Sequence, residues 1–130
     1  MEKPHLVAVY GSLLSNLGNH HVMKGLGKKH YELVGETTIP GFNLFPLGGF
    51  PGIERGENSV KVEVYNVSNE LLKGPLDRLE GYMEGRSDND FYDRQLVKTE
   101  FGDAWIYIYV RGAGQRAIIQ DGDWRNFINK

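Results

Sequence analysis

A short apolar run at residues 6–9 (Leu-Val-Ala-Val) ends abruptly at the tetrad Tyr10-Gly11-Ser12-Leu13. Continuous apolar residues of this length are typical of a central strand that is buried on both faces. Glycine permits backbone angles that are closed to other residues, so we expect Gly11 to turn the chain out of the sheet. The amides after such a strand lie outside its ladder and can bind an anion or a polarised carbonyl. An ordinary turn would use the same residues, so the tetrad alone leaves both interpretations open.

The pattern along the chain predicts one domain over residues 1–130. Strand-like runs cover residues 5–10, 31–39, 42–47, 59–67, 94–101 and 104–110. Short helices are predicted over residues 20–26 and 76–80. About six strands with two or three short helices indicate an α+β fold, built on a small mixed sheet that is curled and barrel-like.

Turn and cap residues set the expected boundaries of these elements. Pro40-Gly41 marks a break between two strands. Asn19 is expected to cap the helix over residues 20–26, and Ser68 to cap the turn after the strand over residues 59–67. Gly74-Pro75 is expected to restart a helix, with the proline near its first position.

Composition narrows the class of protein. The net charge is −2 and the basic residues are scattered, which argues against a nucleic-acid partner. No apolar run approaches the ~20 residues of a membrane span, and no signal peptide is expected at the N-terminus. The chain has no cysteine, which excludes thiol chemistry and fits a reducing compartment. We therefore expect a cytoplasmic protein without nucleic-acid or membrane partners.

The histidines and acidic runs do not form a metal-binding pattern. His20 and His21 are adjacent, so on a helix they point about 100° apart and do not readily chelate one ion. The run Asp88-Asn89-Asp90 lacks the remaining ligand spacing of a calcium loop. We expect no metal site.

A second chemical segment surrounds Glu80. Leu76 precedes it by four residues, which places both side chains on one helix face, and Leu79 and Tyr82 flank it. If that face packs inward, desolvation raises the pKa of the Glu80 carboxyl and makes it a better proton acceptor near neutral pH. The alternative is a solvated surface charge.

Other candidates each carry two interpretations. Arg94 can pair with a substrate carboxylate, or with Asp93 or Asp77 on the surface. The rings of Tyr10 and Tyr92 can line a pocket or fill the core. The glycine-rich residues 48–52 either let the backbone approach a ligand or bend a barrel corner. Ser12 lacks the context of a nucleophile elbow, so its amide is expected to matter more than its hydroxyl.

Aromatic residues near the C-terminus have two expected roles. Residues 105–109 carry a tryptophan and two tyrosines, which would support a homodimer if they are exposed. The chain is expected to be a monomer or a homodimer. Trp124 and Phe127 are expected to fold back on the body of the protein and hold the terminus down.

These segments resemble the γ-glutamylcyclotransferase-like, or AIG2-like, family. The resemblance rests on Val9 and the tetrad, on residues 76–82 (Leu-Asp-Arg-Leu-Glu-Gly-Tyr), and on Tyr92-Asp93-Arg94. Residues 35–41 and 48–52 resemble the family's middle section, so the likeness extends over nearly the whole chain.

The resemblance implies a fold and a reaction. The family fold is a small α+β domain with a curled, barrel-like sheet. Its members let the α-amine of a γ-glutamyl group attack the γ-carbonyl, which releases 5-oxoproline and a free amine without a cofactor. Glu80 corresponds to the family's general acid/base, and the tetrad to its amide cradle. The expected substrate-binding residues are Tyr10, Gly11, Ser12, Leu13, Tyr82, Tyr92 and Arg94.

Two other functions fit the same pocket. One is a binding module that holds a small ligand without turnover and returns it unchanged on denaturation. The other is a different acyl or amide cleavage, such as removal of a γ-glutamyl protecting group from a biosynthetic intermediate. Similarity of fold does not choose among these.

Overall fold

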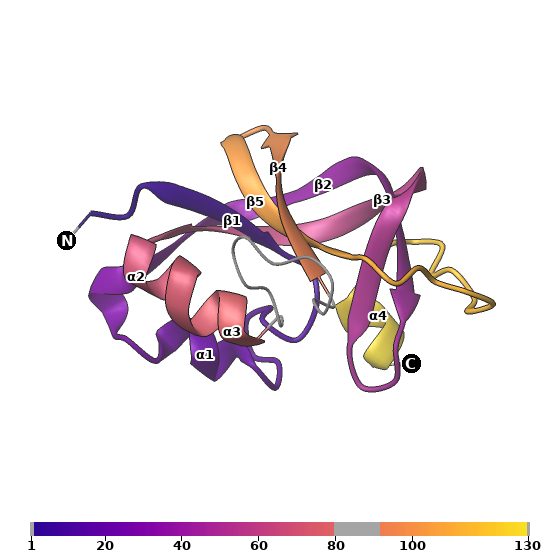
Figure 1. Cartoon of the computed structure of the whole chain (residues 1–130), viewed down its shortest axis with the longest axis horizontal. Coiled ribbons are helices and arrows are strands. Elements are labelled where there is room, and N and C mark those ends of the chain that lie inside the picture. The colour runs from indigo at the N-terminus through magenta and orange to yellow at the C-terminus, as the bar shows by residue number, and fades with distance from the viewer. Residues whose placement is uncertain (1, 80–91, 130) are drawn as a thin grey trace.

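The computed structural model describes residues 2–79 and 92–129 (Figure 1). Within them the chain forms one mixed sheet of five strands in the order β2-β3-β1-β5-β4. The strands are β1 (His5–Val9), β2 (Tyr31–Pro46), β3 (Pro51–Val67), β4 (Tyr92–Thr99) and β5 (Gly102–Tyr109). The predicted α+β class with a curled, mixed sheet is confirmed. The hydrogen-bonded order ends at β2 and β4, so the sheet stays open.

Short helical segments cover one face of the sheet. They are α1 (His20–Lys24), η1 (Lys28–His30), α2 (Asn69–Leu71), η2 (Leu72–Leu76), α3 (Asp77–Leu79) and α4 (Trp124–Ile128). Figure 1 shows α1, α2 and α3 gathered on the same side of the sheet. None of the helices in the described residues has the length and hydropathy to cross a membrane.

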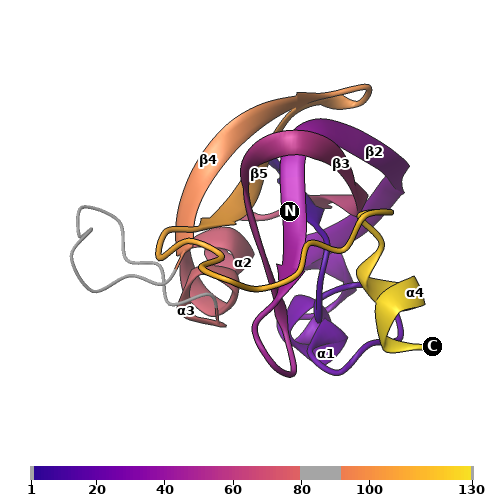
Figure 2. The ribbon, with the colours of Figure 1, turned by 90° about the vertical axis from the view of Figure 1, so that its right-hand side faces the viewer.

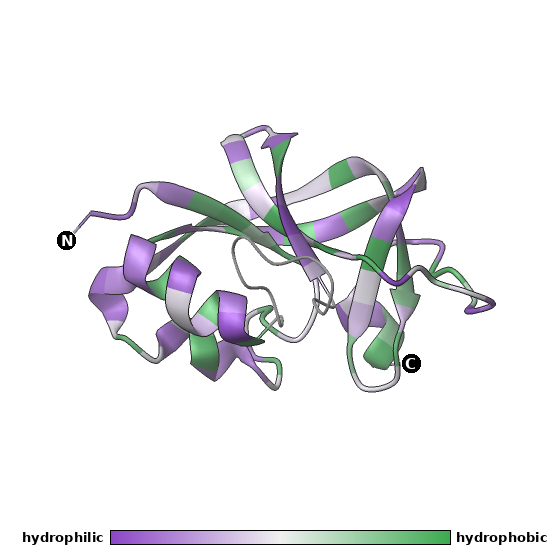
Figure 3. Ribbon diagram, viewed as in Figure 1, coloured by the Kyte–Doolittle hydropathy of each residue, from purple (hydrophilic) through white to green (hydrophobic). Residues whose placement is uncertain are grey.

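Strand β1 is the buried central strand that its apolar run predicts. Val7 and Ala8 are almost fully buried, and the hydrophobic colouring continues along this strand in Figure 3. Val7 pairs with Tyr65 of β3 in an antiparallel ladder and with Trp105 of β5 in a parallel one. Because β1 has a partner strand on each side, the tetrad that follows it lies at the end of the central strand of the sheet.

The predicted break at Pro40-Gly41 is wrong. Strand β2 continues through it, and the pairing with β3 shifts register between Pro40 and Phe42. Gly41 has a φ of 89°, which accommodates the irregularity without ending the strand. The two strands predicted here are therefore one, and β3 begins at Pro51, well before the predicted position 59. Figure 2 shows the curvature of this long β2–β3 hairpin.

The predicted helix restart at Pro75 is also wrong. Pro75 lies inside η2, a π-helical segment that joins α2 to α3. The amide of Asp77 bonds to the carbonyls of Leu72 and Gly74, so the chain widens around the proline and continues. Ser68 does cap the start of this segment, since its hydroxyl accepts from the amide of Leu71 at 3.1 Å. The face that carries Leu71, Leu72 and Leu76 is fully buried.

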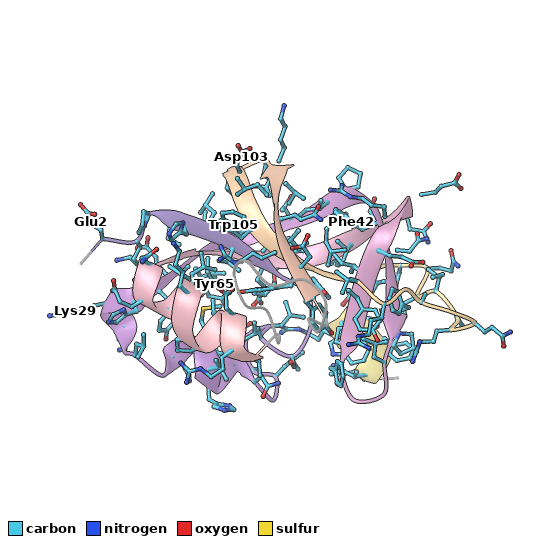
Figure 4. The ribbon with its side chains drawn as sticks, in the orientation of Figure 1. Glu2, Lys29, Phe42, Tyr65, Asp103 and Trp105 are labelled. Carbon is cyan, nitrogen blue, oxygen red and sulfur yellow. The ribbon has the colours of Figure 1, made fainter. Side chains whose placement is uncertain are left out.

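None of the three aromatic residues of β5 is fully exposed. Tyr107 is 2% exposed, and Trp105 and Tyr109 are half-buried. Figure 4 labels Trp105 on β5, where the guanidinium of Arg94 lies 4.5 Å from its ring. The exposed aromatic surface expected for a dimer is therefore absent from this strand.

The C-terminal segment packs on the body, as its aromatic residues predict. Trp124 is 3% exposed and stacks on Phe127 with ring centroids 5.4 Å apart. Phe127 itself remains 37% exposed, so Trp124 provides the anchor. The carbonyl of Gly122 accepts a hydrogen bond from the amide of Lys61 at 2.8 Å, which ties this segment to β3.

Candidate active site

A cavity of about 530 Å³ opens where β1 ends. Its walls are residues 8–13 of β1 and the loop that follows, residues 49–51 of the β2–β3 turn, and Arg78 and Leu79 at the end of α3. Asn19, Tyr92 and Tyr107 complete the lining. The tetrad and the β2–β3 turn, far apart in the sequence, thus meet at one site.

Tyr10 both fills the core and lines the cavity. Its side chain is 6% exposed, and its hydroxyl donates to the carbonyl of Tyr107 at 2.6 Å. The phenol is therefore positioned by β5. Both interpretations of this ring hold at once.

Gly11 is required for space, and not for the backbone freedom that we expected of it. Its φ is not positive, so the turn does not require glycine. A β-carbon at this position would lie 2.6 Å from Cγ and 2.8 Å from Cδ of Pro51. Gly11 therefore allows the β2–β3 turn to approach the tetrad. The glycine-rich residues 48–52 form part of this close approach, because Pro51 supplies the ring.

Hydrogen bonds fix the loop over residues 11–19. The amide of Asn19 donates to the Ser12 carbonyl, and its side-chain Nδ2 donates to Ser12 Oγ, both at 2.9 Å. The helix cap expected of the Asn19 side chain is wrong, since this group holds Ser12 instead. His20 Nδ1 donates to the Leu13 carbonyl at 2.9 Å. Within the described chain, no group accepts from the amides of Ser12 and Leu13.

A buried glutamate fixes the same loop from β3. Glu63 Oε1 accepts from the amide of Ser15 at 2.7 Å and from the hydroxyl of Tyr65 at 3.0 Å. Its Oε2 accepts from Ser15 Oγ at 2.6 Å and from Arg125 of α4 at 3.2 Å. Figure 4 places Tyr65 between the sheet and the helical layer. The loop position thus depends on β3 and on the C-terminal helix.

Arg94 pairs with Asp77. Its Nε lies 2.9 Å from Asp77 Oδ1, and its terminal nitrogen donates to Oδ2 at 3.2 Å. Asp77 was one of the partners that the sequence left open, but the expected surface position is wrong because both side chains are buried. The hydroxyl of Tyr107 also donates to Asp77 Oδ1, at 2.6 Å. Arg94 is not among the residues that line the cavity.

Tyr92 holds the β2–β3 turn in place. It is 5% exposed and donates through its hydroxyl to the carbonyl of Pro51 at 2.7 Å. Tyr92 also lines the cavity. Tyr92 thus lies beside the same proline that closes on Gly11.

Glu80 and Tyr82 lie outside the described residues. The residue that precedes Glu80 in the sequence, Leu79, lines the cavity and is 38% exposed. Arg78 lines the cavity as well and was missed by the sequence interpretation. Its place two residues before Glu80 was the available signal. Among the described residues its guanidinium has no ion-pair partner.

The cavity has no metal-binding constellation in the described part of the chain. No group of three or more histidine or acidic side chains there is close enough to hold an ion. What the arrangement offers is an apolar chamber, two donor amides on a fixed loop and one guanidinium.

Comparison with known proteins identifies the family. The family model described as gamma-glutamyl cyclotransferase, AIG2-like, matches residues 7–126. The gamma-glutamylcyclotransferase family protein YtfP of Escherichia coli K12 is 36% identical over 118 residues, which cover 91% of this chain and 94% of that protein. The solution structure of the Escherichia coli protein superposes with a TM-score of 0.69 at 35% identity, covering 95% of this chain and 98% of that one.

A further relative is named for a specific substrate. The gamma-L-glutamyl-butirosin B gamma-glutamyl cyclotransferase of Niallia circulans is 32% identical over 107 residues, which cover 79% of this chain and 65% of that protein. Together with the match over residues 7–126, these likenesses extend from β1 to α4. The chain belongs to the AIG2-like gamma-glutamyl cyclotransferase family.

Proposed function

We propose that this protein is a γ-glutamyl cyclotransferase that releases 5-oxoproline and a free amine, with Glu80 as general acid/base. The observation that carries the proposal is the meeting of the tetrad with the end of α3 in one cavity. The residue after α3 in the sequence is Glu80. Family membership and the names of the relatives support the same reaction.

The reaction is intramolecular, so the site has to fold the substrate and move protons. The α-nitrogen of the glutamyl group forms a bond to the γ-carbon, and the bond from that carbon to the leaving nitrogen breaks. The proton lost by the α-amine passes through Glu80 to the leaving amine. Holding a near-attack geometry supplies several kcal/mol of the barrier, and the rigid cavity walls serve this purpose.

The amides of Ser12 and Leu13 take the anionic part of the substrate. Both residues line the cavity, and neither amide has an acceptor among the described residues. Donors of this kind bind a carboxylate or the oxyanion that develops on the γ-carbonyl, and losing one typically costs ~3 kcal/mol of transition-state stabilisation. Hydrogen bonds from Asn19 and to Glu63 keep the loop from relaxing toward the ligand.

The test is product analysis with a panel of γ-glutamyl amines and γ-glutamyl dipeptides. We expect 5-oxoproline from the wild type and a loss of roughly 10²–10⁴ in kcat for Glu80→Gln, which keeps the side-chain shape but not the base. Glu57→Gln is the matched control, because Glu57 is exposed on β3 and does not line the cavity. Full turnover by Glu80→Gln would refute the assignment. Intact ligand recovered after denaturation would instead indicate a binding module.

A further inference from the structure

We infer that the substituent on the amide nitrogen of the substrate is uncharged, apolar and of aromatic size, so that the substrate class is a γ-glutamyl arylalkylamide with no second carboxylate. This inference rests on the proposed function and specifies its substrate. It is carried by the size of the cavity, by the apolar side chains at its opening and by its charge.

The cavity is larger than a γ-glutamyl group requires. Its volume of about 530 Å³ lies within the range of roughly 300–1,000 Å³ that takes drug-sized ligands. A glutamyl group is much smaller than such a ligand. The remaining space must therefore receive the group that leaves.

Two exposed apolar side chains line the cavity. Phe50 at the tip of the β2–β3 turn is 47% exposed, and Leu79 at the end of α3 is 38% exposed. Both line the cavity, so two of the large apolar side chains that the protein leaves uncovered face the same chamber. Exposed apolar surface gathered at one hollow is typical of a ligand site. An aromatic ring or a comparable apolar group would cover it.

The charge of the lining matches one carboxylate. Arg78 is the only cationic side chain among the described residues of the cavity wall. The α-carboxylate of the glutamyl group takes this cation as its partner, and the amides of Ser12 and Leu13 then take the oxyanion that develops on the γ-carbonyl. The other polar side chains of the described lining bond within the protein: Asn19 donates to Ser12, and the hydroxyls of the three lining tyrosines donate to Tyr107 O, Pro51 O and Asp77. A carboxylate on the leaving nitrogen would have to lose water against Phe50 and Leu79 with no second cation among the described residues of the wall, which is unfavourable.

A matched pair of substrates tests the charge. γ-Glutamyl-phenethylamide and γ-glutamyl-phenylalanine differ only by the carboxylate on the leaving group. We expect kcat/KM to be at least about tenfold higher for the phenethylamide. γ-Glutamyl-methylamide tests the apolar space, and we expect it to be at least about 100-fold poorer, because each buried methylene is worth roughly 10- to 200-fold in an apolar pocket.

Variants of Phe50 test whether this side chain sets the preference for the leaving group. Phe50→Ala should lower kcat/KM for the phenethylamide by about tenfold and leave the methylamide within about twofold. Phe50→Arg adds a second cation to the described wall of the cavity and should shift the preference toward γ-glutamyl-phenylalanine by about tenfold. Leu96→Ala is the control, since Leu96 is 52% exposed on β4 and does not line the cavity. Equal rates for the phenethylamide and the methylamide, or a preference of the wild type for γ-glutamyl-phenylalanine, would overturn the inference.

Failure of the proposed function gives a different result. If no substrate yields 5-oxoproline, the cyclotransferase assignment fails, and titration calorimetry with the same three compounds decides the ligand class. Tightest binding of the phenethylamide would support the inferred class for a binding site without turnover. Equal binding of all three compounds, or no binding of any, would refute it.

Discussion

Tyr65 is a buried side chain whose ionisation is coupled to folding. It is 2% exposed, and its hydroxyl donates to Glu63 Oε1 at 3.0 Å. Burial, followed by the negative charge of Glu63 and this hydrogen bond, raises the pKa of Tyr65 well above its ordinary value. The folded state therefore binds this proton more tightly than the unfolded state. The stability that it contributes is complete below pH ~10, the pKa in the unfolded chain, and falls as the pH rises above that value.

Urea unfolding between pH 8 and pH 11, at intervals, tests this coupling against Tyr65→Phe. Above pH ~10 we expect the wild type to lose up to ~1.4 kcal/mol per pH unit relative to the variant. Below pH ~10 the difference between the two proteins should be constant, because Tyr65 is protonated in both states. Parallel stability curves across the whole range would show that Tyr65 ionises normally in the folded protein.

Residue-level pairing was the least predictable part of the site. The sequence leaves two acidic side chains as partners for Arg94, Asp93 and Asp77, and only the packing of α3 against β4 and β5 selects Asp77. Arg78 reaches the cavity because α3 ends there, which depends on the π-helical turn before it. Such choices are set by tertiary contacts, so neither composition nor spacing reveals them.

At the scale of elements, the tetrad loop and the β2–β3 turn form one unit through Gly11 and Pro51. A β-carbon at Gly11 would meet the proline ring, which is held by the hydroxyl of Tyr92. We expect Gly11→Ala to push the turn and the loop apart and to cost about 1–3 kcal/mol of unfolding free energy. Because a displacement of about 1 Å can cost 10²-fold in rate, kcat/KM should fall by about that factor.

Gly18→Ala is the matched control for this prediction. Gly18 lies in the same loop, is exposed, and has no atom within 4 Å of the added β-carbon. Its stability should stay within ~0.5 kcal/mol of the wild type, and its activity should be unchanged. Steady-state kinetics and urea unfolding of both variants decide the matter. Equal behaviour of the two would mean that the contact with Pro51 does not position the loop.

The elements that were predictable are those that local patterns specify. The apolar run of β1 gave a central strand, and Ser68 gave a helix cap. The errors at Pro40-Gly41 and Pro75 share one cause. In both places tertiary contacts outweigh a local helix- or strand-breaking residue. At Pro40-Gly41 the ladder with β3 resumes after a bulge. At Pro75 the buried leucine face holds the helical segment together across a π turn.

At the scale of the whole molecule, both ends of the chain converge on Glu63. Ser15 follows the N-terminal strand, Arg125 belongs to α4, and both donate to this one carboxylate of β3. The loop over residues 11–19, called the cavity loop from here on, is therefore coupled to the packing of the C-terminal segment on the sheet. The segment has a second attachment at Gly122, where the carbonyl bonds to Lys61.

This attachment allows the coupling to be tested far from the cavity. Gly122 has a φ of 64°, and a β-carbon there would collide with the carbonyl of Ser59. Gly112→Ala separates the strain of a positive φ from the collision with Ser59, since Gly112 has a φ of 77° and open space around it. We expect Gly112→Ala to cost about 1 kcal/mol and Gly122→Ala about 2–4 kcal/mol.

Amide hydrogen exchange shows which parts of the protein the Gly122→Ala substitution loosens. If the C-terminal segment detaches, the amide of Lys61 loses its acceptor and exchanges faster, while Arg125 leaves Glu63. The amide of Ser15, which donates to the same carboxylate, should then exchange faster too, and kcat/KM should fall although no cavity residue has changed. Faster exchange at Lys61 with unchanged exchange at Ser15 and unchanged kinetics would show that the cavity loop is independent of α4. Loss of protection from exchange at both amides would show that the geometry of the active site depends on the packing of the C-terminal segment against β3.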